Sequence, residues 1–331
     1  MKNRLLNILL WTFFCVPIVF ADSSGTIDQN VSPIPQFISI WNTKIQGFSN
    51  PNQIKLPLSQ NGTYDFDVEW GEGKTNHITR YDQQETIHTY KIPGEYTVTI
   101  TGIIEGFGFD LSFTSLHEDN GKLVDVANWG PVKLHNNGFQ FCGVGLIGFS
   151  ANDVPDISNI TNMQGMFANA SKFNHDIGPW NVRNVTNMSG MFVDAKSFNQ
   201  DIGSWDVSNV TDMSGMFCYA DAFNQNIGSW DVSKVSDMSV MFREAYTFNQ
   251  DIGSWDVSAV EDMNGMFLDA QSFNQDISSW DVSNVLDMSE MFEGAHSFKQ
   301  DIGAWNISPN TDTYDMFKGA VAYNREYGNN Y

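Results

Sequence analysis

Carboxylates recur at a fixed spacing of 25 residues in the C-terminal half of the chain. One row comprises Asp201, Asn226, Asp251, Asp276 and Asp301, and a second comprises Asp206, Asp231, Asp256 and Asp281. Carboxylate and amide oxygens are the ligands that Ca²⁺ prefers, so such rows could hold cations between neighbouring repeats. The same side chains readily accept backbone N–H bonds at turns, and we favour that interpretation. The sequence therefore predicts no cofactor and no metal, with calcium as the alternative, and the first row is a candidate partner or cation row.

The sequence lacks the residue patterns of common enzyme chemistry. The six histidines have no spacing typical of zinc sites, and there is no Gly-x-Ser-x-Gly motif or phosphate-binding glycine loop. A glycoside hydrolase needs two carboxylates in different environments, whereas the acids here repeat identically. We therefore predict that the protein is not an enzyme. The alternative is an enzyme or glycan-binding protein with its site in residues 105–150, which contain Asp110, Glu118, Asp119 and Asp125.

A third row of the repeat differs in every copy. It comprises Val193, Cys218, Arg243, Leu268 and Glu293. Such variety indicates exposed positions, and a recognition surface needs diverse side chains on a rigid support. We therefore predict that this row is a variable binding strip.

The elements that would position these rows are copies of one 25-residue unit, in which a Met-Phe pair appears seven times. Its structural columns are Trp180, Trp205, Trp230, Trp255, Trp280 and Trp305, together with Phe192, Phe217, Phe242, Phe267 and Phe292. A fixed period of about 20 to 50 residues is the signature of a solenoid, in which each unit stacks on its neighbours. The sequence therefore predicts a stack of seven coils.

Each coil has a candidate helix and a candidate strand. Thr211 is a suitable helix N-cap, and Met213 and Met216 follow at helical spacing. Residues 198–202 are too few for a helix and are bounded by Gly203 and Ser204, which predicts a strand. A further row is expected to form a buried amide ladder and comprises Asn199, Asn224, Asn249 and Asn274.

The repeat resembles a known family. The pattern Trp-Asp-Val-Ser-Asn-Val-Thr-Asp-Met-Ser-Gly-Met-Phe at residues 205–217 is similar to that of BspA-like leucine-rich-repeat surface proteins of bacteria, and the resemblance covers residues 155–320. It implies a leucine-rich-repeat-like solenoid that is exported and displayed. The role it implies is adhesion or partner binding.

The N-terminal half has a different pattern. Residues 63–70 and 96–100 alternate between apolar and polar side chains, which predicts strands. Residues 68–73, 88–90 and 93–100 resemble the marker sequence of PKD-type domains, although the usual motif has Asp where this chain has Glu72. The resemblance implies an immunoglobulin-like β-sandwich that serves as a spacer or binding module.

These observations together predict an α+β protein. The expected parts are a signal peptide at 1–21, a polar leader at 22–36, a PKD-like β-sandwich at 37–104, a junction and cap at 105–150, seven coils with one strand and one helix each at 151–320, and a C-terminal cap or tail at 321–331. The signal peptide is indicated by a basic start, an apolar run from Leu5 to Phe20 and Ala21 before a polar segment. No lipoprotein or sorting signal is recognised, so a secreted or cell-surface location is expected, without membrane insertion after cleavage. Cys142 and Cys218 are expected to remain unpaired, because Cys142 precedes the first coil and Cys218 lies in the third, which places them too far apart for a disulfide.

The charge distribution narrows the class of partner. The chain has 39 acidic and 17 basic residues and a net charge of −22. Such a field disfavours nucleic acids and anionic membrane surfaces. The sequence therefore predicts an exported repeat protein that acts in adhesion or binds a protein or glycan on a cell surface, and the negative charge favours a basic partner.

Overall fold

The computed structural model describes residues 34–109, 119–144 and 148–328. The chain divides into two units, Met1–Pro35 and Gln36–Tyr331, and the description below concerns the second. The predicted signal peptide, Asp110 and Glu118 lie outside the described residues. Within the described part, no helix is both long and apolar enough to cross a membrane.

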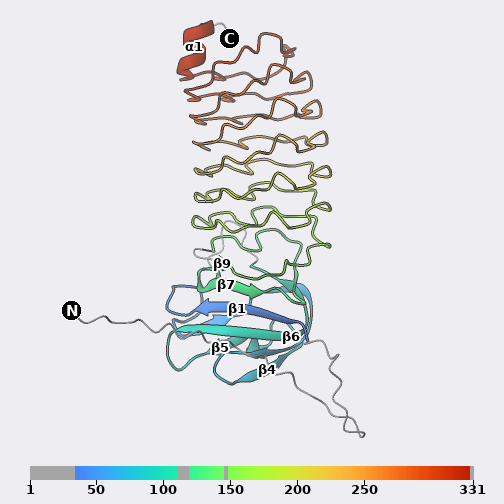
Figure 1. Cartoon of the computed structure of the whole chain (residues 1–331), viewed down its shortest axis with the longest axis vertical. Coiled ribbons are helices and arrows are strands. Elements are labelled where there is room, and N and C mark those ends of the chain that lie inside the picture. Colours follow the sequence, from blue (N-terminus) through green and yellow to red (C-terminus); the bar gives the residue numbers. More distant parts are fainter. Residues whose placement is uncertain (1–33, 110–118, 145–147, 329–331) are drawn as a thin grey trace, which may run out of the picture. The chain divides into compact units, whose positions relative to one another are not determined.

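The N-terminal part is built from β-strands (Figure 1). The main sheet has seven strands, with the path β4-β3-β6-β1-β7-β9 and β8 paired to β6. Its members are β1 (Gln36–Asn42), β3 (Leu58–Glu69), β4 (Thr75–Ile78), β6 (Glu95–Phe107), β7 (Leu123–Asn128), β8 (Lys133–Leu134) and β9 (Gly148–Phe149). A second sheet pairs β2 (Gln53–Lys55) with β5 (Ile87–Thr89), and the short 3₁₀ turns are η1 (Gln84–Thr86) and η2 (Asn120–Lys122).

Both strands expected from alternation are present, because their apolar side chains need a common buried face. In β3, Phe66 and Val68 are buried while Asp65 and Asp67 point to solvent. The sheet continues past residue 104, since β7 pairs antiparallel with β1. Residues 105–150 therefore contribute strands to the same sheet. Two register shifts in the β1–β7 pairing interrupt the alternation that would have revealed β7 in the sequence.

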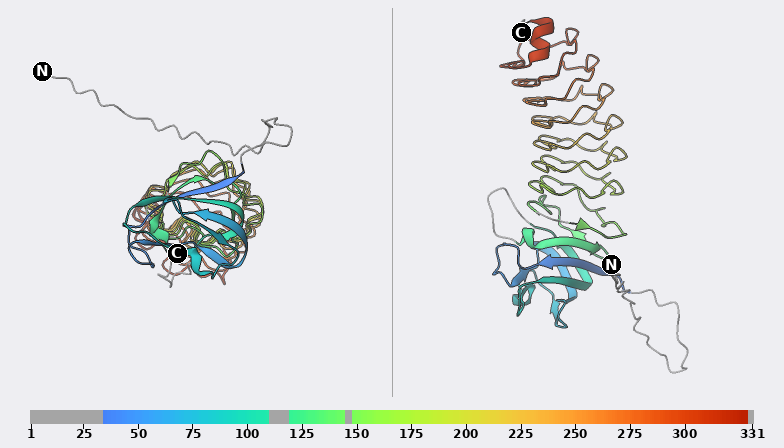
Figure 2. Two further views of the ribbon diagram at one scale, coloured as in Figure 1. Left: turned by 90° about the horizontal axis from the view of Figure 1, so that it is seen from below. Right: turned by 60° about the vertical axis from the view of Figure 1, so that its left-hand side comes forward.

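The repeats form coils that stack on one another (Figures 1 and 2), and backbone hydrogen bonds join neighbouring coils. Met188, Gly190 and Phe192 donate their N–H groups to Asp212, Ser214 and Met216 of the next coil, at 2.9, 2.7 and 2.9 Å. The intervening N–H groups close turns within the coil, as from Met191 to the Met188 carbonyl at 3.1 Å. Along this segment, alternate N–H groups therefore bind the next coil, and the others stabilise the turns.

The prediction of one strand and one helix per coil is wrong. In the described residues, each coil consists of turns and a single bridge position, and the α-helix of the chain is α1 (Val321–Tyr327). Gly190 and Asp194 have φ values of 58° and 56°, and this left-handed conformation recurs in every coil. An α-helix needs continuous right-handed dihedrals, so the helical spacing of the methionines reflects burial by consecutive turns. The fold is rich in strands and turns.

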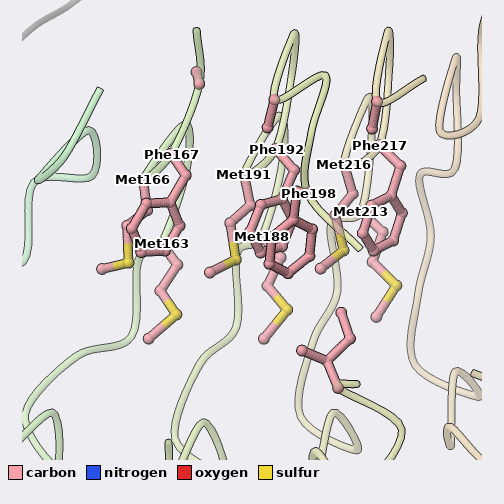
Figure 3. Packing of buried hydrophobic residues seen from close by; sticks show 14 of the residues in the cluster. Met163, Met166, Phe167, Met188, Met191, Phe192, Phe198, Met213, Met216 and Phe217 are labelled. Carbon is pink, nitrogen blue, oxygen red and sulfur yellow. The ribbon is translucent and has the colours of Figure 1, made fainter. Parts of the chain in front are cut away.

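Aromatic rings form two columns through the coils. Successive rings of the Phe167, Phe192 and Phe217 column have centroids 5.7 and 5.6 Å apart. The second column contains Phe198, whose ring stacks on Phe192 of the same coil at 4.0 Å. Figure 3 shows these rings beside repeating methionine pairs. Identical phenylalanine rings at the same position of consecutive coils fix the register of the stack, because a shift of one coil along its neighbour would separate the stacked rings.

The left-handed positions lead to a stability prediction. Glu290 has a φ of 59°, whereas equivalent coils have Gly190, Gly215 and Gly265. A left-handed conformation costs an L-residue about 1–2 kcal/mol, partly offset by the larger entropy of unfolded glycine. Glu290→Gly should therefore stabilise the protein by about 0.5–1 kcal/mol in urea unfolding. The reciprocal Gly215→Glu should destabilise it, and a loss of stability in both variants would contradict this account.

Candidate functional site

The first acidic row forms caps of tight turns. Asp201 Oδ1 accepts the Gly203 N–H at 3.0 Å, and Asp251 accepts that of Gly253 at the same distance. Asn226 makes the equivalent bond to Gly228 at 3.0 Å, so the charge is not needed for the turn. A Cβ at Gly203 would lie 2.5 Å from the Asn226 carbonyl oxygen, so a side chain there would require the neighbouring coil to shift. Asp276 and Asp301 bond in the same way, and all five side chains are exposed.

The second acidic row has the same arrangement with a serine added. Asp206 Oδ1 accepts both the hydroxyl of Ser208 at 2.6 Å and its N–H at 3.2 Å. These hydrogen bonds hold the pKa of Asp206 below its usual range, and equivalent bonds lower the pKa values of Asp231 and Asp281. Throughout the described ranges, no group of three or more His, Cys, Asp or Glu side chains is placed to hold a metal ion. The geometry of both rows is that of turn caps.

The asparagine row forms an amide ladder between coils. Asn199 Oδ1 accepts the backbone N–H of Asn224 and the side-chain amide of Gln225, at 2.9 and 3.0 Å. The same pair of bonds joins Asn249 to the coil that follows it, at 2.9 Å each. The ladder is half-buried rather than fully buried. It links neighbouring coils and leaves these oxygens engaged.

The variable strip predicted from the sequence is not an outward surface. Cys218 and Leu268 are each 7 % exposed, and Val193, Arg243 and Glu293 are half-buried. Val193 Cγ2 lies only 3.2 Å from where a Cβ of Gly190 would stand, so this side chain fills space inside the turn. Burial raises the pKa of the Cys218 thiol to about 12, which makes it a poor nucleophile. The residues vary because packing at this position tolerates several shapes.

A different column presents varied side chains to solvent. We call it the turn strip, and it comprises Lys196, Asp221, Tyr246, Gln271 and His296. All are exposed except Asp221, which is half-buried and whose pKa is raised by burial. This column also differs in every copy, so the signal was present in the sequence. What the sequence did not show was which of two neighbouring variable columns faces outward.

Neighbouring residues support the side chains of the turn strip. Lys196 Nζ lies 3.4 Å from Asp194 Oδ1, and the Tyr246 hydroxyl donates to Glu244 Oε2 at 2.7 Å. Asp194 and Glu244 occupy the left-handed position of their coils, with φ values of 56° and 53°. The turn strip is therefore held by the same turns that stack the coils.

The repeat identifies the family. A sequence model described as Mycoplasma protein of unknown function, DUF285, matches residues 146–250 and 225–330. The chain belongs to the DUF285 family. This match is consistent with the BspA-like repeat resemblance, whereas no comparison supports a PKD-like domain. Neither a curated protein nor a solved structure matches the chain.

The acidic residues on the N-terminal side of the DUF285 coils have structural partners. Asp119 is 1 % exposed and lies 3.2 Å from Lys122 Nζ. Asp125 Oδ1 accepts the Ser150 N–H at 2.9 Å, while Oδ2 accepts the hydroxyl of the same serine. These two acids, which were considered for an enzyme site, connect segments of the β-sheet part. The buried pair of Asp119 and Lys122 has no periodic signal in the sequence.

Residues of the proposed PKD marker, which precede the DUF285 match, also pack locally. His88 is buried, its ring stacks on Trp70 with centroids 4.7 Å apart, and Nε2 lies 3.1 Å from Glu72 Oε1. Burial lowers the pKa of His88, and the bond to Glu72 opposes that shift. Glu69 Oε1 accepts the N–H groups of Gly71 and Gly73 at 2.9 and 3.0 Å, which closes the turn after β3.

Cys142 and Cys218 are both free and buried.

Proposed function

We propose that this DUF285 protein is an exported surface or secreted protein that acts in adhesion by binding a partner, without catalysis, and that the partner contacts the turn strip. The observation that carries the proposal is the turn strip itself. Five consecutive coils present different side chains at one backbone-defined position. A rigid support with varied side chains is what a recognition surface requires.

The charge of the chain favours a basic protein or a glycan with basic groups as the partner. Both acidic rows are exposed, and the net charge of the chain is −22. Exposed charges of this kind act mainly on the association rate, and salt screens them over a Debye length of about 8–10 Å. The turn caps use only local oxygen contacts, so we propose binding that does not need calcium.

The test compares two triple variants of the chain from residue 22 onwards. Tyr246→Ser, Gln271→Ala and His296→Ser together should weaken binding at least tenfold in a screen of cell-surface glycans and basic proteins. Asp251→Asn, Asp276→Asn and Asp301→Asn keep the turn bonds, as Asn226 shows, and remove three charges. This second variant should mainly lower the association rate and its dependence on salt.

Three results would contradict the proposal. Unchanged affinity in the turn-strip variant would exclude the turn strip as the contact surface. Loss of binding on calcium chelation would favour the cation alternative. If binding is abolished only by changes within residues 119–144, the site belongs to the β-sheet part, as in the alternative of a glycan-binding protein or enzyme.

A further inference from the structure

The two ends of the coil stack differ in how their backbone groups are paired. At the N-terminal end, the carbonyl of Gln140 accepts the Phe109 N–H at 2.9 Å, and that of Cys142 accepts the Asn120 side-chain amide at 3.0 Å. On the other side of the same segment, Phe141 donates its N–H to Met166 of the first coil at 2.9 Å. The β-sheet part therefore supplies donors for the carbonyl edge of the stack.

At the C-terminal end, the last coil presents the complementary groups. Glu290 and Gly294 donate their N–H groups to the carbonyls of Tyr314 and Lys318 in the last coil, at 2.8 and 2.9 Å. The donors at equivalent positions of the last coil include the N–H groups of Thr313, Asp315 and Gly319. Within residues 34–109, 119–144 and 148–328, none of these three N–H groups has an acceptor. We call these three groups the donor edge.

The geometry of the donor edge suits a row of acceptors. Asp315 and Gly319 have positive φ values of 55° and 73°, the alternation that aligns backbone N–H groups on one side. The carbonyls of Thr313 and Asp315 accept turn bonds inside the coil, so they do not add acceptors to this edge. A pocket of about 430 Å³ lies against it and is lined by Thr313, Asp315, Gly319, Asn324 and Gly328, among others.

Helix α1 packs on the last coil (Figure 1), and its Asn324 lines the pocket beside the donor edge. Tyr323 stacks on Phe298 and Phe317, with centroids 5.8 and 4.1 Å away, and so ends the second aromatic column. The apolar side chains of Tyr314 and Val321 remain 67 % and 60 % exposed beside the donor edge. The end of the stack thus combines free donors with exposed apolar surface, which is typical of an edge that binds another polypeptide.

We propose that the donor edge binds the main-chain carbonyl groups of a coil-forming segment from another polypeptide. The same bonds join each coil of this chain to the next. A second copy of this chain is unsuitable, because its own carbonyl edge is occupied by Phe109 and Asn120, and two C-terminal ends would place donors against donors. A neutral carbonyl row is favoured over an anion, because the surrounding chain is strongly acidic and Lys318 already pairs with Asp315 and Glu293.

The chain itself supplies a probe for this site. An acetylated and amidated peptide of residues 186–198 contains the carbonyls of Asn187, Ser189 and Val193, which accept bonds from the preceding coil at the positions equivalent to Thr313, Asp315 and Gly319. Its Asp194 and Lys196 give it no net charge. At saturating peptide, amide exchange at Thr313, Asp315 and Gly319 should slow at least tenfold. The amide of Met288, which already donates to Asp312, should be unaffected and serves as the internal reference.

The controls separate sequence-specific pairing from other binding. A peptide with the same residues in scrambled order should give no protection, and Thr313→Pro should reduce the protection of Asp315 at least fivefold while exchange at Met288 stays slow. No protection at millimolar peptide would overturn the proposal, as would equal protection by the scrambled peptide. Protection by sulfate or acetate alone would show an anion site instead. None of these results depends on the turn strip, so this proposal and the proposed function fail independently.

Discussion

Replacing Lys122 with methionine should lower the free energy of unfolding of the β-sheet part by about 3–5 kcal/mol. The Lys122 side chain is fully buried, and its Nζ donates to the carbonyls of Ser49, Asn50 and Gln53 at 3.0, 3.1 and 3.0 Å. It also lies 3.2 Å from Asp119 Oδ1. Methionine preserves most of the apolar stem but leaves a buried carboxylate without its counter-charge and three carbonyls without this donor.

A matched variant distinguishes burial from ion pairing. Lys133 forms an exposed pair with Glu105 at 2.8 Å, and Lys133→Met should leave the urea midpoint nearly unchanged. Adding Asp119→Asn to Lys122→Met should recover part of the lost stability, because the uncompensated charge is removed. Equal small effects of Lys122→Met and Lys133→Met would show that the buried pair does not stabilise the sheet part.

The sequence could not reveal this pair, because its contacts are distant and irregular. Asp119 accepts the N–H groups of Ser49 and Lys55, which lie 70 and 64 residues earlier in the chain. No periodicity links these positions. The stacking of the repeats was predictable for the opposite reason, since identical aromatic residues recur at one spacing and must meet their copies.

The secondary structure of the coils shows where spacing alone fails. Met213, Met216 and Phe217 are buried together, as a helix would bury them. Gly215 between them has a φ of 59°, and Tyr219 has one of 58°. Two left-handed residues convert the segment into successive turns, and helical spacing carries no information about the sign of φ.

The candidate site was predictable only where its contacts are local. The turn caps of the acidic rows join residues two positions apart, so the general behaviour of Asp was sufficient to expect them. The exposure of a variable column depends on the neighbouring coil. Cys218 is buried while Lys196 is exposed, although both columns vary equally in the sequence.

Trp255→Ala should destabilise the coil stack by about 3–5 kcal/mol. Trp255 is 4 % exposed, and its ring stacks on Phe242 with centroids 6.4 Å apart. Its indole N–H donates to the Ile227 carbonyl of the preceding coil at 3.1 Å. The tryptophan rings contact the continuous phenylalanine column. Trp280 and Trp305 also stack on each other, with ring centroids 6.3 Å apart. The expected loss therefore combines a cavity with a broken link between coils.

Two controls separate these contributions. Trp255→Phe keeps an aromatic ring and removes the indole N–H. It should cost about 1 kcal/mol, because the Ile227 carbonyl still accepts the backbone N–H of Trp230. Ala259→Ser, at an exposed position of the same coil, should be neutral. Because each coil contacts only its neighbours, hydrogen exchange in Trp255→Ala should accelerate most in residues 226–280 and least in the first coil. Uniform acceleration along the stack would show that the coils unfold as one cooperative unit, and an effect no larger than that of Ala259→Ser would contradict the structural role of the tryptophan column.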